Sequence, residues 1–170
     1  MYNSQGYELN RLVYDEIIIY LRKSRQDDPN ETVEEVLSRH EMQLQDFALR
    51  TWGARIPEGN IYREVVSGET IDDRPEIKKV LDRVQESKTK AVLVVECSRL
   101  TRGDLLDLGT MVHVLRYTST LCVTLDRYYN LEDKHHRRAF EDELKRGTDY
   151  LEYTKETLMR GRRLSASQGY

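Results

Sequence analysis

Residues 17–25 read IIIYLRKSR, so an apolar run changes abruptly into a segment with three cations and one hydroxyl group. The apolar part is continuous, whereas a strand with one solvent-facing side alternates between apolar and polar residues. A second run of this kind, AVLVVE, occupies residues 91–96. Such continuous runs are typical of strands that helices cover on both faces. The two runs therefore predict an α/β fold with a mostly parallel central sheet.

Outward from this stretch, short aliphatic segments alternate with segments of helical periodicity. The predicted strands are residues 16–21, 61–66, 91–96 and 121–125, and the predicted helices between them are residues 31–52, 75–87 and 105–116. This order predicts a three-layer α/β/α arrangement. Ligands of such sheets bind beyond the carboxyl ends of the strands. The residues that directly follow each strand are therefore the candidates for function.

After Leu125 the pattern changes to one long helical segment, about residues 134–163. Its apolar residues form a narrow, heptad-like stripe of Phe140, Leu144, Leu151 and Leu158. A narrow stripe with charges on the other faces indicates a helix that leaves the globule and packs against a partner. An ordinary amphipathic helix of the core is the alternative interpretation.

The composition limits the class of protein. The chain has 170 residues and a formal net charge of −3, which fits one domain without a uniformly basic surface. No apolar run approaches the roughly 20 residues that cross a bilayer, and the first residues lack the pattern of a secretory signal. We therefore expect no membrane contact and a cytoplasmic location. Cys97 and Cys122 are predicted to be buried free thiols, and the four histidines lack the spacing of a zinc site, so no metal is expected.

The predicted strand ends bring together one serine and four arginines. Arg22 and Ser24 follow the first strand, Arg74 follows the second, and Arg99 and Arg102 follow the third. Four guanidinium groups in one place would repel each other unless they held an anion, and the guanidinium fork matches phosphate oxygens. The cluster therefore predicts a phosphate-binding site.

The serine in this cluster could serve several kinds of chemistry. A Ser-His-Asp arrangement is not favoured, because no histidine follows a predicted strand, and the G-x-x-x-x-G-K-[ST] pattern of a nucleotide-binding loop is absent. The remaining reaction is attack of the serine oxygen on a phosphodiester, with arginines stabilising the negative charge that develops. A phosphate-binding domain whose serine only donates a hydrogen bond is the alternative.

Four segments, in this order along the chain, resemble the catalytic domain of serine recombinases, the resolvase/invertase group. They are YLRKSR (20–25), HEMQLQDFA (40–48), YREVVSGETIDDRPEIKKVL (62–81) and VVECSRLTRGD (94–104). The likeness is greatest to large serine integrases and transposon recombinases. It extends over residues 16–163 and implies a resolvase-like α/β/α domain followed by a long C-terminal helix. The implied boundaries are 1–15 for a flexible N-terminal extension, 16–130 for the catalytic domain, 131–163 for the helix and 164–170 for the start of a linker.

The resemblance implies a role for each matching residue. Ser24 is the implied nucleophile, and the implied phosphate ligands are Arg22, Arg74, Arg99 and Arg102. The supporting positions are Tyr20, Gln43, Glu64, Ser67 and Gly68. Two residues depart from the family's pattern: Ser98 stands where aspartate is usual, and Glu64 stands where aspartate is common. The first change leaves open which group transfers a proton or orients the arginines.

The implied activity is site-specific DNA recombination through a 5′-phosphoserine intermediate, as in the integration, excision or transposition of a mobile element. No cofactor is implied, and the implied partners are DNA and further copies of the chain, as a homodimer on each site and a tetramer in synapsis. Candidate DNA contacts at the basic end of the long helix are Arg160, Arg162 and Arg163. No helix-turn-helix or zinc-ribbon pattern follows them, so we expect a further C-terminal DNA-binding region in the full-length protein. The alternatives are a non-catalytic phosphate- or nucleic-acid-binding module, a degenerate recombinase and, less favoured, a phosphatase-like hydrolase.

Overall fold

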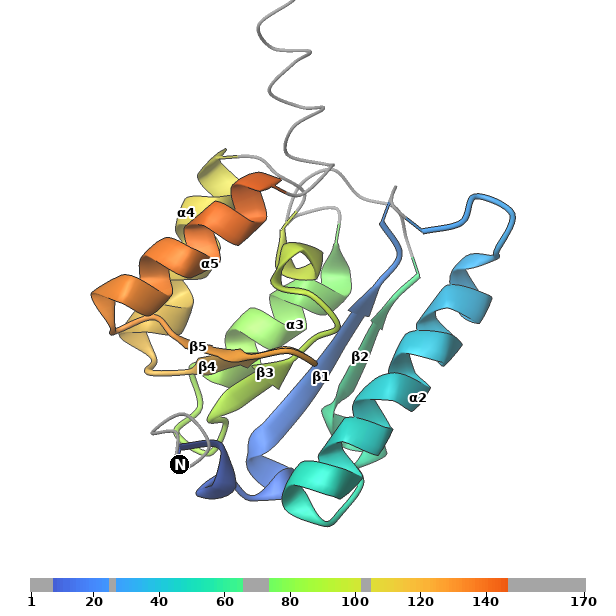
Figure 1. Cartoon of the computed structure of the whole chain (residues 1–170), viewed down its shortest axis with the longest axis horizontal. Helices are drawn as coiled ribbons and strands as arrows, with labels where there is room; N and C mark the ends of the chain where they lie inside the picture. Colours follow the sequence, from blue (N-terminus) through green and yellow to red (C-terminus); the bar gives the residue numbers. More distant parts are fainter. Residues whose placement is uncertain (1–7, 25–26, 66–73, 102–104, 147–170) are drawn as a thin grey trace, which may run out of the picture.

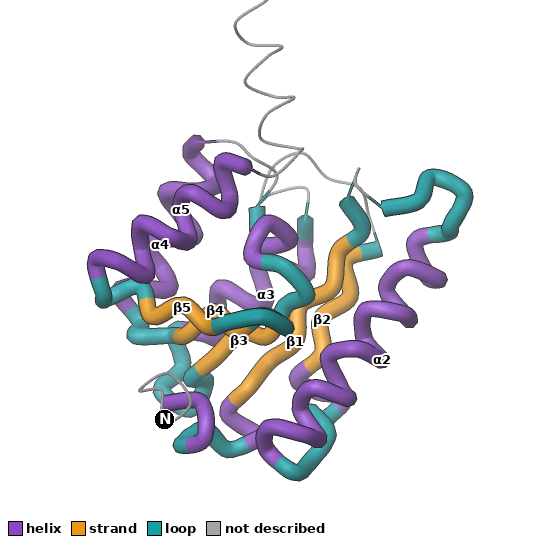
Figure 2. Tube along the Cα trace, viewed as in Figure 1, coloured by secondary structure: helices purple, strands orange, loops and turns teal. Residues whose placement is uncertain are grey.

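A computed structural model of the chain describes residues 8–24, 27–65, 74–101 and 105–146. Its centre is a five-stranded sheet in the order β2-β1-β3-β4-β5 (Figures 1 and 2). The strands are β1 (Ile17–Arg22), β2 (Ile61–Glu64), β3 (Ala91–Leu93), β4 (Leu121–Val123) and β5 (Tyr128–Asn130). β1 pairs in parallel with β2 and β3, β3 pairs in parallel with β4, and β5 runs antiparallel to β4. The predicted mostly parallel sheet is confirmed, with β5 as an additional strand.

Helices cover both faces of this sheet (Figure 1). The helices are α2 (Val33–Trp52), α3 (Pro75–Val84), α4 (Leu105–Tyr117) and α5 (Lys134–Arg146), and the short 3-10 turns are η1 (Tyr14–Glu16), η2 (Glu58–Asn60) and η4 (Cys97–Leu100). Ile17, Ile19 and Leu21 pack with α2 in one core cluster. Ile18 and Tyr20 pack with α3, α4 and α5 in the other. Successive side chains of β1 thus enter opposite cores, which explains why its apolar run is continuous.

The residues that border α2 set both of its ends. At its start, the Thr32 hydroxyl accepts a hydrogen bond from the Glu35 backbone N–H at 3.1 Å, which satisfies one free donor of the first turn. At its end, Gly53 has a φ of 74° and donates its N–H to the Leu49 carbonyl, as is typical of a left-handed glycine cap. These two residues therefore fix where α2 begins and ends.

The structure describes the first part of the predicted long helix as α5. Phe140 and Leu144 of the predicted stripe are buried in the core cluster, and the Phe140 ring packs edge-on against the Tyr129 ring with a centroid distance of 5.4 Å. For these two residues the stripe serves the core. Leu151 and Leu158 lie outside the described residues, so the protruding part of the helix stays a prediction. None of the described helices is long and apolar enough to cross a lipid bilayer.

Candidate active site

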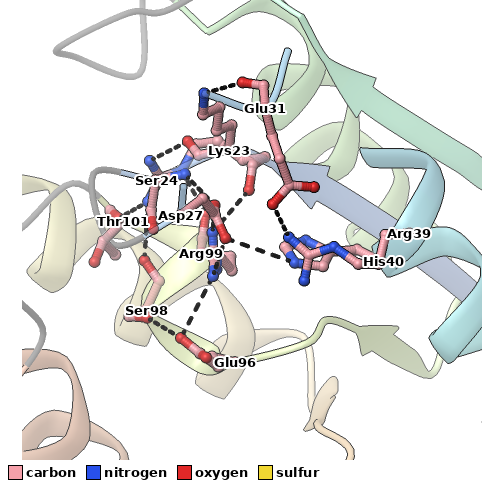
Figure 3. A network of polar contacts seen from close by, with 11 residues as sticks. Lys23, Ser24, Asp27, Glu31, Arg39, His40, Glu96, Ser98, Arg99 and Thr101 are labelled. Atoms are coloured by element: carbon pink, nitrogen blue, oxygen red, sulfur yellow. Dashed lines mark hydrogen bonds and ion pairs between the residues drawn. The ribbon is translucent and has the colours of Figure 1, made fainter. Parts of the chain in front are cut away.

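The nucleophile candidate, Ser24, lies two residues beyond β1 and is half-buried. Its backbone N–H donates to the Oδ2 atom of Asp27 at 2.8 Å, and the Asp27 N–H donates to the Ser24 carbonyl at 3.2 Å. These reciprocal hydrogen bonds hold the main chain in a turn, in the manner of aspartate side chains that bond to nearby backbone. The backbone of Ser24 is therefore held in place by Asp27 (Figure 3).

Arg99 reaches the same turn from η4, which follows β3. Its Nη1 atom donates to Asp27 Oδ2 at 2.5 Å and to the Arg22 carbonyl at 3.2 Å, while its Nη2 atom donates to Asp27 Oδ1 at 3.4 Å. Both side chains of this ion pair are almost fully buried. Burial works to raise the pKa of Asp27, but hydrogen bonds from Arg99 and from the Ser24 N–H outweigh it and lower that pKa. Asp27 is therefore a carboxylate at neutral pH.

Arg22 connects the end of β1 to the loop after β3. Its guanidinium donates to four backbone carbonyls: those of Arg99 at 2.9 Å, Thr101 at 2.8 Å, Ser98 at 3.1 Å and Lys23 at 3.2 Å. The side chain is buried, and a planar guanidinium suits several acceptors at fixed angles. In this structure Arg22 fixes the segment that carries Arg99.

Arg74 directly precedes α3 and is fully buried. Its Nη2 atom donates to Asp107 of α4 at 2.7 Å, and its Nη1 atom donates to the Leu100 carbonyl at 3.3 Å. Arg74 and Arg99 thus each have a buried carboxylate beside them. The protein's own acids relieve the repulsion between these two arginines, so Arg74 and Arg99 do not need a bound anion to coexist. Phosphate binding by the four-arginine cluster stays a prediction.

Tyr20 and Glu64 meet at the start of α3. Glu64 Oε2 accepts the Tyr20 hydroxyl at 3.3 Å and the backbone N–H groups of Glu76 and Ile77, each at 3.1 Å. A carboxylate is favourable there because the first N–H groups of a helix carry partial positive charge. Burial raises the pKa of Glu64 despite these hydrogen bonds, and burial also raises the pKa of Tyr20. Both side chains support the beginning of α3, and with it the position of Arg74.

Other predicted site residues either lie away from this cluster or fall outside the residues that the structure describes. Gln43 is exposed on α2, whereas Gln45 is buried and exchanges hydrogen bonds with the backbone of Ile56 at 2.7 and 3.0 Å. The predicted residues outside the described ranges are Ser67, Gly68, Arg102, Arg160, Arg162 and Arg163. Ser98 donates its hydroxyl to Glu96 at 3.4 Å. Within the described ranges, no group of acidic, histidine or cysteine side chains could hold a metal ion.

Sequence reasoning missed Asp27 and His40. His40 is buried on α2, and its Nε2 atom lies 3.8 Å from Asp27 Oδ1 (Figure 3). No histidine follows a predicted strand, but the neighbouring helix α2 brings His40 to the same place. A weak signal for Asp27 was present, because an aspartate side chain near a turn can bond to neighbouring backbone N–H groups. The site therefore contains an acid and a histidine beside the serine turn.

His40 should make the stability of the protein depend on pH. Burial, followed by the charge of Arg99, lowers the pKa of His40 below its ordinary 6.5, although Asp27 opposes this shift. The unfolded chain then takes up a proton at a higher pH than the native protein. The free energy of unfolding should fall as the pH drops below 6.5, by about 1.4 kcal/mol for each unit of difference in pKa.

Urea unfolding at pH 7.5 and 5.5 measures this effect. The wild type should lose more stability over this interval than His40→Gln, whose side chain stays neutral throughout. His135→Gln, at an exposed position of α5, is the control and should behave as the wild type does. Equal losses in the wild type and in His40→Gln would contradict the prediction.

Comparisons with known proteins identify the family and the fold of the chain. The family model for the resolvase N-terminal domain matches residues 17–160, which include the four arginines of the predicted phosphate-binding cluster. Among solved structures, the N-terminal catalytic domain of TP901-1 integrase is similar with a TM-score of 0.56 at 16% identity, over 83% of this chain and 97% of that one. The C-terminal catalytic domain of ISC1926 TnpA, an IS607-like serine recombinase, has a TM-score of 0.49 at 16% identity, over 89% of this chain and 98% of that one. The predicted family and fold class are confirmed: the chain belongs to the resolvase N-terminal domain family and has the fold of a serine recombinase catalytic domain.

Proposed function

We propose that the chain is the catalytic domain of a site-specific DNA recombinase in which Ser24 attacks a backbone phosphate. The observation that carries this proposal is the position of Ser24. The chain belongs to the resolvase N-terminal domain family, and Ser24 lies in a turn that is hydrogen-bonded to Asp27. Asp27 in turn accepts a hydrogen bond from Arg99, so it links the turn to that arginine. Serine and arginine thus come from the ends of two adjacent parallel strands, where such sheets bind their ligands.

The reaction is a transesterification. A bond forms between Ser24 Oγ and the phosphorus atom while the bond from phosphorus to the 3′ oxygen breaks. The serine loses its proton, the 3′ oxygen gains one, and the products are a 5′-phosphoserine and a free 3′-hydroxyl. The phosphodiester bond energy is retained, so the reverse attack rejoins a strand. Positive charge at Arg99, with Arg22, Arg74 and Arg102 as further candidates, would stabilise the transition state.

Further parts of the proposal rest on the family alone. We infer that the protein acts on DNA as a homodimer at each site and as a tetramer in synapsis, and that residues 131–163 carry these contacts. Arg160, Arg162 and Arg163 would bind phosphates near the cleavage site. Integration, excision or transposition of a mobile element in the cytoplasm is the process that fits this activity, with a further C-terminal region reading the DNA sequence.

One observation favours a second candidate, a non-catalytic module that binds phosphate or nucleic acid. Arg22 donates to four carbonyls and Arg74 donates to Asp107, so these two guanidinium groups already serve the fold. If their role is only structural, Ser24 would contribute a hydrogen bond and no covalent step. The two candidates differ in whether a protein–DNA bond forms.

Trapping that bond tests the proposal. The full-length protein is incubated with DNA that carries its recombination site and a nick that lets the cleaved end diffuse away, and adducts are separated under denaturing conditions. We expect an adduct whose DNA-linked peptide contains Ser24, and its loss by at least about a thousandfold in Ser24→Ala. Ser98→Ala, which alters a half-buried serine nearby, is the control and should still form the adduct. An adduct on another residue, or none with the wild type, would favour the second candidate.

A further inference from the structure

Asp27 contacts both the nucleophile candidate and Arg99. Its carboxylate is 7% exposed, and both of its oxygen atoms have contacts. Oδ2 accepts from the Ser24 N–H and from Arg99 Nη1, and Oδ1 accepts from Arg99 Nη2 and lies 3.8 Å from His40 Nε2. A single oxygen atom therefore connects the backbone of the nucleophile to the guanidinium of a phosphate-binding candidate.

The surroundings of Arg99 offer two other groups that could orient it. Glu96 lies 3.7 Å from Arg99 Nη2, but its side chain is 49% exposed, so water weakens that contact. Ser98 carries no charge, and its hydroxyl donates to Glu96. Among the described residues, Asp27 is thus the buried acid that forms a two-pronged hydrogen-bonded ion pair with Arg99. Such paired hydrogen bonds fix the plane of a guanidinium group as well as its distance.

We propose that Asp27 is a positioning residue that holds Ser24 and Arg99 in the relative orientation needed for attack on the phosphodiester. Asp27 then supplies the carboxylate that Ser98, which stands where aspartate is usual in the family, cannot supply. This inference rests on the proposed function. His40 from α2 closes the buried side of the carboxylate, so Asp27 has little freedom to turn away. A displaced nucleophile reacts much more slowly, because misplacement by an ångström costs on the order of a hundredfold in rate.

Adduct formation by variants of the full-length protein tests the positioning role. Asp27→Asn keeps one acceptor oxygen but loses the charge that orients Arg99, and should lower the maximal rate about a hundredfold. Asp27→Glu keeps the charge on a longer side chain, so it preserves the ion pair needed for folding and should lower the rate about tenfold. The DNA concentration for half-maximal rate should stay within about twofold in both, because the role concerns the bound complex.

Glu31→Gln is the matched control. Glu31 is a nearby acid that pairs with Arg39 at 2.9 Å, and its side chain is 29% exposed (Figure 3). Its removal should leave the rate within about twofold of the wild type. Equal rates for Asp27→Asn and the wild type would overturn the proposal. A faster Asp27→Asn would also overturn it, since Asp27 would then compete with the phosphate for Arg99.

A second measurement needs no DNA and separates this inference from the proposed function. In a Ser24→Cys background, the pH dependence of iodoacetamide alkylation gives the pKa of the new thiol. The native thiols should not interfere, because Cys97 and Cys122 are buried and burial raises the pKa of both. Adding Asp27→Asn removes a nearby negative charge and should lower the pKa of the new thiol by about one unit, a tenfold change in the thiolate ratio.

The outcomes of the two measurements are distinct. An unchanged thiol pKa on adding Asp27→Asn would overturn the contact between Asp27 and position 24, whatever the DNA experiment gives. Absence of a wild-type adduct would overturn the proposed function, while the thiol measurement would still decide whether Asp27 acts on position 24. Adding Asp27→Glu instead should leave the thiol pKa nearly unchanged, because the charge remains.

Discussion

Asp107→Ala is expected to lower the free energy of unfolding by about 3–5 kcal/mol, because it removes a buried acid that is hydrogen-bonded to a buried cation. Arg74 is fully buried, and its Nη2 atom donates to Asp107, whose side chain is 4% exposed, at 2.7 Å. A guanidinium in these surroundings cannot regain the hydration that it has in the unfolded chain. The variant should therefore be far less stable than the loss of one hydrogen bond predicts.

Urea unfolding monitored by circular dichroism measures this loss, and a double variant identifies its cause. Arg74→Met combined with Asp107→Leu removes both charges and should be more stable than Asp107→Ala alone, because apolar pairs often replace buried ion pairs at little cost. Lys79→Ala breaks an exposed pair with Glu76 on α3 and is the control, with no measurable change expected. If Asp107→Ala costs less than about 1 kcal/mol, the stabilising role of this pair is wrong.

The central sheet could be predicted because its signal is local. β1 spans Ile17–Arg22 against the predicted 16–21, since a strand that alternates between two buried cores needs an unbroken apolar run. α2 spans Val33–Trp52 against the predicted 31–52, because Thr32 and Gly53 mark its ends. β5 was missed because its three residues follow β4 closely and become a strand through pairing with that strand. Pairing of this kind depends on the sheet rather than on the residues of the strand.

The candidate site was predictable in its location but not in its ion pairs. The strand-end rule placed Ser24, Arg22 and Arg99 together, because parallel strands end at one edge of the sheet. It could not identify Asp107 as the partner of Arg74, since the two residues are 33 positions apart in the sequence and the contact depends on how α4 packs.

Gln43 shows the limit of a family resemblance. Side chains two residues apart on a helix point in directions that differ by about 200°. Gln43 and Gln45 of α2 therefore face different surroundings. Gln43 is exposed and Gln45 is buried against the backbone of Ile56. A motif match selects a residue by its order in the chain, and such a match carries no information on which face of α2 meets the sheet. The supporting role of Gln43 therefore stays a prediction, which adduct formation by Gln43→Ala can decide.

Arg22→Lys is expected to lower the free energy of unfolding by about 3 kcal/mol and to loosen the segment that carries Arg99. The Arg22 guanidinium donates to the carbonyls of Ser98, Arg99 and Thr101 from one buried plane. A lysine ammonium is a single point with a flexible stem, so it can reach only part of this set. Buried carbonyls would then lose their donors while the positive charge remains.

Hydrogen exchange separates loosening of the segment from general instability. The amides of Arg99 and Thr101 donate within η4 and its end, to Glu96 and Ser98, and they should exchange at least about tenfold faster in Arg22→Lys under native conditions. Arg63→Lys is the control, because Arg63 pairs with Glu41 and Glu58 near the surface, where the same change should cost less than about 1 kcal/mol. If both variants leave exchange in η4 unchanged, the hydrogen bonds of Arg22 do not hold this segment. Faster exchange in Arg22→Lys alone would mean that Arg22 holds the segment that carries Arg99.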